Sequence, residues 1–153
     1  MGYELRAVIG RRAPLNRMIE SIGARLVALT SEMFLLPWTD ELFDRLGPDE
    51  SSGSTGLRYL HAALVPILAQ ASQLGPIAYV EAEFFGGVGE QGTAFFRNGV
   101  LHSTAPTGPI QKRLRPRSPI SQALHMLGVE AVDGKDEFDT IGLGRHRHLE
   151  DWA

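Results

Sequence analysis

The sequence predicts an α+β domain with a mainly antiparallel sheet of about five to six strands and helices packed on one side of it. Two observations carry this prediction. Segments rich in β-prone residues come in consecutive groups instead of alternating singly with helical segments. The pair Asn98-Gly99 also stands between two such segments, which is the strongest short signal for an antiparallel hairpin. A length of 153 residues, 43% of them apolar, matches a single domain over 1–153.

The first part of the chain is expected to contain strands and two short helices. Alternating residue types predict a strand over Tyr3–Gly10, and apolar spacing of three and four predicts a helix that starts after Ala13 and ends at Gly23. One or two short strands are expected within Leu26–Leu36, with a break near Ser31-Glu32. Thr39 is a good N-cap for a helix that Gly47-Pro48 would end.

The middle of the chain shows the longest helical pattern. Apolar residues share one helical face from Leu57 to Leu74, and Gly75-Pro76 would end that helix. Pro66 lies inside the pattern and cannot donate a backbone hydrogen bond, so a kink or break is expected there.

The remaining elements are mostly strands. A strand is expected over Ile77–Phe85, followed by a glycine-rich loop. The Asn98-Gly99 hairpin would pair Thr93–Arg97 with Val100–Ser103. Ser118-Pro119 then places a cap and an N1 proline at the start of a helix that Gly128 would end. The segment after Gly128 shows little periodicity.

Composition limits the compartment and the classes of site. The chain has no cysteine, which excludes disulfides and thiolate metal sites. No signal peptide is recognisable, and no apolar run approaches the roughly 20 residues needed to span a bilayer, so a soluble cytoplasmic protein without a membrane partner is expected. The net charge of −3 is unevenly distributed. Residues 96–117 carry five basic and no acidic groups, whereas residues 26–95 carry two basic and nine acidic groups.

Residues 87–92 match the pattern G-x-G-x-x-G directly after a predicted strand. A dinucleotide site needs a helix next, whereas here another strand is expected. The kinase-type glycine loop would need partner motifs that the chain lacks. A plain hairpin loop is therefore favoured over a phosphate site, and no cofactor is expected.

Glu81 and Glu83 would place two carboxylates on one face of a strand, about 7 Å apart, with Tyr79 and Phe85 beside them. If Ala78, Val80, Ala82 and Phe84 face the core, these four side chains face solvent. Aromatic residues on an exposed face are typical of interfaces. We therefore predict a partner-binding surface made of Tyr79, Glu81, Glu83, Phe85, Gly87, Gly89 and Gln91.

Other titratable groups form weaker patterns. His146 and His148, with Glu150 and Asp151, include residue types that ligate transition metals, but the spacing fixes no closed ligand set, and no metal site is expected. Lys112, Arg113, Arg115 and Arg117 form a basic run without interleaved aromatic residues, which favours a solvated loop over nucleic-acid binding. No catalytic constellation is recognised.

The segments 78–91, 127–129 and 136–146 resemble a group of small uncharacterised bacterial proteins, some of which are similar to immunity proteins that neutralise a partner toxin. This resemblance covers the C-terminal half and implies a cytoplasmic binder. The favoured function is a small protein-binding or inhibitor module. The glutamates of the predicted surface would favour a basic partner. Homo-oligomerisation is left open. The alternative is a small metal- or carboxylate-dependent hydrolase that uses Glu81, Glu83 and the C-terminal histidines.

Overall fold

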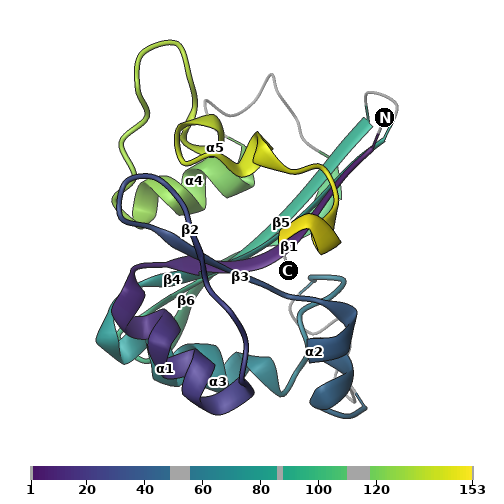
Figure 1. Ribbon diagram of the computed structural model, residues 1–153, viewed down its shortest axis with the longest axis vertical. Helices are drawn as coiled ribbons and strands as arrows, with labels where there is room; N and C mark the ends of the chain where they lie inside the picture. The colour runs from purple at the N-terminus through teal and green to yellow at the C-terminus, as the bar shows by residue number, and fades with distance from the viewer. Residues whose placement is uncertain (1, 49–55, 86–87, 110–117, 153) are drawn as a thin grey trace.

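The structure, a computed structural model, describes residues 2–48, 56–85, 88–109 and 118–152. In this part of the chain, six strands form one antiparallel sheet in the order β2-β3-β1-β4-β5-β6 (Figure 1). The strands are β1 (Tyr3–Gly10), β2 (Val27–Ala28), β3 (Phe34–Pro37), β4 (Ile77–Phe85), β5 (Val88–Arg97) and β6 (Val100–Pro109). The predicted α+β class and antiparallel sheet are confirmed.

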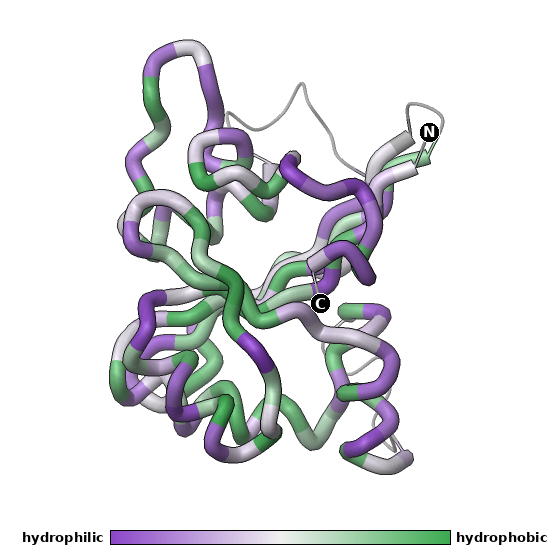
Figure 2. The backbone as a smooth tube through the Cα atoms, viewed as in Figure 1, coloured by the Kyte–Doolittle hydropathy of each residue, from purple (hydrophilic) through white to green (hydrophobic). Residues whose placement is uncertain are grey.

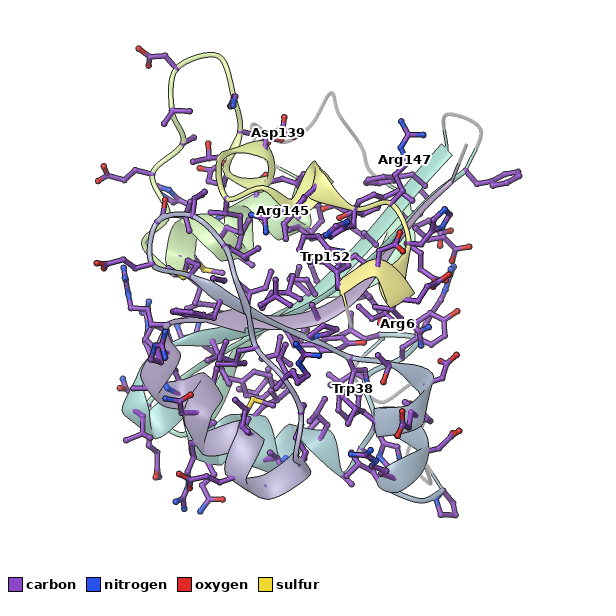
Figure 3. The ribbon with its side chains drawn as sticks, viewed as in Figure 1. Arg6, Trp38, Asp139, Arg145, Arg147 and Trp152 are labelled. Atoms are coloured by element: carbon purple, nitrogen blue, oxygen red, sulfur yellow. The ribbon has the colours of Figure 1, made fainter. Side chains whose placement is uncertain are left out.

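The helices pack on both faces of this sheet, which corrects the expectation that they lie on one side. They are α1 (Arg12–Ile22), α2 (Asp40–Arg45), α3 (Leu64–Ala71), α4 (Pro119–Met126) and α5 (Glu137–Thr140), with the 3₁₀ turns η1 (Ser72–Leu74), η2 (Leu143–Arg145) and η3 (Leu149–Trp152). One core cluster joins the sheet to α4 and the C-terminal segment, and the other joins it to α1, α2 and α3. Figure 3 shows Trp152 and Trp38 on opposite sides of the sheet.

Two apolar layers explain why both faces are covered. The central strands β1 and β4 are buried on successive residues, so their side chains enter the two clusters alternately. Ala78 and Val80 belong to the cluster with α4 and the C-terminal segment, which we call the first cluster, on the first face of the sheet. Ile77 and Tyr79 belong to the cluster with α1, α2 and α3, which we call the second cluster, on the second face. Strands buried on both faces carry nearly continuous apolar runs. Figure 2 shows hydrophobic residues along the strands at the centre of the molecule.

Local signals placed most element ends correctly. Gly23 adopts a left-handed conformation after α1, and Ser31 and Glu32 have positive φ between β2 and β3. The side chains of Thr39 and Ser118 cap α2 and α4. Asn98 and Gly99, with φ of 55° and 85°, form the turn between β5 and β6, so the predicted hairpin is confirmed.

The predicted helix over Leu57–Leu74 is wrong in its first part, because α3 begins only at Leu64. Pro66 therefore lies in the first turn of α3, where its missing N–H leaves no helical hydrogen bond unmade. Residues 57–63 form turns and bends instead. Their apolar spacing reflects burial of Leu57 and Leu60 in the second cluster rather than a helical face.

The expected glycine-rich loop is also shorter than predicted. Gly89 and Gly92 are residues of strand β5, which pairs with β4 from Val88 onward. Residues 86–87 lie outside the described part of the chain. The G-x-G-x-x-G pattern thus lies mainly in a strand, which is not the geometry of a dinucleotide-binding turn.

Replacing Gly99 by alanine should lower the free energy of unfolding by about 1–2 kcal/mol, because a side chain disfavours the left-handed conformation. A Cβ there would also lie 3.1 Å from the side chain of Gln73. The matched control is Gly144→Ala, since Gly144 has no positive φ and its Cβ would meet nothing within 4 Å among the described residues. Chemical denaturation of both variants checks this, and equal stabilities would contradict it.

Candidate functional site

Glu81 is a buried carboxylate at the centre of a polar cluster on the second face of the sheet. It is 2% exposed, and its two oxygens accept four hydrogen bonds. The backbone amides of Arg58 and Tyr59 donate over 2.6 and 3.0 Å, and the Tyr79 hydroxyl donates over 2.9 Å. The hydroxyl of Thr107 donates the fourth. Because a buried charge is tolerated only when it is paired or hydrogen-bonded, this donor set allows the carboxylate to stay inside.

A glycine allows these donors to approach. Gly92 lies opposite Glu81 in the β4–β5 register, and a Cβ at this position would collide with Thr107 and Leu57. The amide of Thr107 also donates to the carbonyl of Gly56 over 3.0 Å. The segment 56–60 is thus held against strands β4 and β6 by hydrogen bonds from both sides.

Further contacts secure the same segment. The indole N–H of Trp38 donates to the carbonyl of Tyr59 over 3.2 Å. The buried ring of His61 accepts from the amide of Ala63 at Nδ1, so its Nε2 carries the proton and donates to the carbonyl of Gly47 over 2.7 Å. These bonds use both ring nitrogens, which gives His61 a structural role.

Arg6 brings a buried cation to the cluster. It lies opposite Glu81 in the β1–β4 register, and its side chain is 7% exposed. Its Nη1 donates to Asp40 over 2.7 Å, and its guanidinium lies 4.3 Å from the centre of the Tyr59 ring. The Nε of Arg6 is buried and has no hydrogen-bond partner among the described residues. Figure 3 shows Arg6 beside the sheet, between the C-terminal segment and the layer of α2.

The cluster changes the ionisation of one tyrosine. Burial raises the pKa of Tyr79 well above its ordinary value, and the negative charge and hydrogen bond of Glu81 raise it further, while Arg6 acts in the opposite direction. The Tyr79 hydroxyl is therefore a hydrogen-bond donor throughout the physiological range.

The predicted partner-binding face is only partly exposed, which corrects the expectation that it faces solvent. Tyr79 and Glu81 are buried, because α3 and the segment 57–61 cover this face of β4. Glu83 and Phe85, further along the same strand, are exposed, and Phe85 reaches 76%. The predicted alternation is real, but it divides the set into a buried pair and an exposed pair.

The other predicted contact residues also separate. Gln91 is buried, and its side-chain oxygen accepts from the amide of Ile120 over 2.9 Å, so it satisfies a free N–H at the start of α4 on the first face. Gly89 is half-buried within β5. Gly87 lies outside the described residues. The position of Gln91 thus removes it from the surface that carries Glu83 and Phe85.

Three glutamates lie side by side where strands β1, β4 and β5 extend beyond the helices. Glu83 is the register partner of Glu4 on one side and of Glu90 on the other, so all three share one face. Glu90 pairs with Arg58 over 2.5 Å, and Glu4 lies 3.9 Å from Arg6. We call Glu4, Glu83 and Glu90 the acidic row. Between it and Glu81 lies a hollow of about 10 Å³, lined among others by Arg58, Tyr59 and Glu83.

The C-terminal histidines are placed apart from this hollow. The ring of His146 packs edge-on against Trp152 at 4.7 Å, and the carbonyl of Arg147 accepts from the amide of Glu4 over 2.8 Å. Neither His146 nor His148 lines the hollow. Within the described residues, no group of three or more His, Asp or Glu side chains is arranged to hold a metal ion. The basic run 112–117 lies outside the described residues.

No protein-family model matches the chain, and no curated protein sequence or solved structure is significantly similar to it. In the described part of the chain, no helix has the length and apolar character needed to cross a bilayer.

Replacing Glu81 by glutamine should lower the free energy of unfolding by about 2–4 kcal/mol, because the four donors lose a charged acceptor and two of them, a backbone amide and a hydroxyl, face an NH₂ group. Glu83→Gln is the matched control on the same strand. It should change stability by less than about 0.5 kcal/mol, since Glu83 is exposed. Urea denaturation separates the two, and similar losses for both variants would show that burial of Glu81 does not matter.

The raised pKa of Tyr79 predicts a loss of stability at high pH. The unfolded chain releases the phenolic proton near pH 10, about the ordinary value, while the folded chain retains it. The contribution is therefore complete below about pH 10 and declines as the pH rises above it. The free energy of unfolding should fall less steeply with alkaline pH in Tyr79→Phe than in the wild type. Parallel curves would be inconsistent with a buried, hydrogen-bonded phenol.

Proposed function

We propose that the chain is a protein-binding module, of the inhibitor or immunity-protein kind, and that its contact surface is the open end of the second sheet face. The observation that carries this proposal is the 76% exposure of Phe85 at the end of β4. Aromatic side chains anchor protein interfaces, and a free monomer gains little from displaying one.

The surroundings of Phe85 support a contact surface. Glu83 precedes it by two residues on the same face, and the partly exposed ring of Tyr59, which lies over Arg6, lines the same hollow as Glu83. The hydrogen bonds to Glu81 hold the backbone of Arg58 and Tyr59 in place beside Glu83. A rigid surface loses little conformational entropy on binding, which favours affinity. We call the surface of Glu83, Phe85, Tyr59 and Arg58 the open-end surface.

The geometry lends less support to the alternative, a small hydrolase. The oxygens of Glu81 are engaged by four donors, and the adjoining hollow of about 10 Å³ holds no more than about one water molecule. Substrate pockets are larger, on the order of 300 Å³ or more. The C-terminal histidines do not line this hollow.

Phe85→Ala should strongly reduce capture of the partner while leaving the fold intact. The tagged wild-type chain, Phe85→Ala and Leu74→Ala would each be used to retrieve proteins from a lysate of the native host. Leu74 is the matched control, since it is 57% exposed and belongs to η1, which precedes β4 at the end opposite to Phe85. A central aromatic anchor contributes about 2 kcal/mol or more, so recovery should fall at least about tenfold in Phe85→Ala alone.

Two results would contradict the proposal. One is a partner that Phe85→Ala retrieves as well as the wild type does. The other is a partner lost equally with Leu74→Ala, because the open-end surface would then have no special role. Circular dichroism and melting curves of the three proteins show whether the fold is unchanged.

A further inference from the structure

The acidic row indicates the chemistry of the partner, an inference that rests on the function proposed above. Directly opposed residues of neighbouring antiparallel strands lie about 4.5–5.5 Å apart. Glu4, Glu83 and Glu90 therefore place three like charges along one line across β1, β4 and β5. Like charges in such positions destabilise a sheet. An arrangement that weakens the free protein calls for a compensating cation.

Among the described residues, the ion pairs of the row involve only its two ends, although the charge of Arg58 also acts on Glu83. Arg58 pairs with Glu90, and Arg6 lies near Glu4 but directs its Nη1 to Asp40. Glu83, in the middle, forms no ion pair or side-chain hydrogen bond with another described residue. Counting Asp40 and Glu81, five carboxylates lie around two guanidinium groups. Adding Arg147, whose carbonyl accepts from the amide of Glu4, still leaves an excess of negative charge.

We propose that the acidic row binds an arginine- or lysine-bearing segment of the protein partner, with Glu83 as the carboxylate that receives the cationic group. Phe85 follows Glu83 on the same face and would pack against the aliphatic stem of that side chain. The protein's own arginines make comparable contacts with a carboxylate and with an aromatic ring. Arg58 binds Glu90 through a charge-assisted pair, and the guanidinium of Arg6 lies over the ring of Tyr59.

Charge complementarity selects this occupant over others. A nucleic acid would bring phosphates to an acidic surface, which is unfavourable. A cationic segment instead gains both steering at long range and neutralisation of the row at contact. The partner surface is therefore expected to be basic, and association should weaken as salt screens the charges.

The test uses fluorescein-labelled peptides and the full-length chain. A Gly-Arg repeat, a Gly-Ser repeat and a Gly-Glu repeat of equal length are titrated by fluorescence anisotropy at low and high salt. We expect binding of the Gly-Arg peptide alone, weaker at high salt. Glu83→Gln should weaken it about fivefold, whereas Glu130→Gln, which removes the same charge from an exposed position outside the row, should change it less than about twofold.

Equal binding of the three peptides, or equal losses in the two variants, would overturn the proposal. So would binding that appears only after Lys112, Arg113, Arg115 and Arg117 are replaced by serine, because the chain's own basic run would then be the occupant of the row. Capture of the same partner by Phe85→Ala and by Glu83→Gln distinguishes this inference from the proposed function. If its capture needs Phe85 but not Glu83, the acidic row fails as the recognition element and the binding function stands.

Discussion

The carboxylate of Glu81 is the interaction on which the arrangement of the second sheet face depends. It accepts from the amides of Arg58 and Tyr59, and from the hydroxyls of Tyr79 and Thr107. A buried carboxylate without such donors would cost a large part of the stability of a small domain, so the position of segment 56–60 across β4 stabilises the fold. Leu57 and Leu60 are buried as a result, and α3 starts only at Leu64.

The same constraint determines what the face can present to a partner. The segment 56–60 covers β4 only as far as Glu81. Tyr79 is therefore buried, while Glu83 and Phe85 are exposed to solvent. Arg58 and Tyr59 are brought beside Glu83 by the bonds that hold their amides. This face of β4 therefore has a buried part around Glu81, which stabilises the fold, and an exposed part that carries Glu83 and Phe85. This division places the proposed binding activity on Glu83 and Phe85.

Much of the fold could be predicted from local signals, whereas most of the site could not. Caps, positive-φ turns and the Asn98-Gly99 hairpin depend on neighbouring residues, and they were found. The second helical layer was missed because Glu81 and Glu83 suggested a solvent-facing side of β4, although the successive apolar residues Ile77–Val80 indicated burial on both faces. The roles of Arg6 and Glu4 depend on strand register, which pairs residues far apart in the sequence. Only a correct strand order could have brought them to Glu81 and Glu83.

Amide hydrogen exchange at Arg58 and Tyr59 tests the central role of Glu81 most directly. Both residues lie outside helices and strands, where amides ordinarily exchange quickly. If their N–H groups donate to the buried carboxylate, they should exchange as slowly as the amides of the central strand β4, and Glu81→Gln should accelerate both. Exchange of these two amides at the rate of an open loop in the wild-type protein would show that Glu81 does not hold the segment, and would contradict the account.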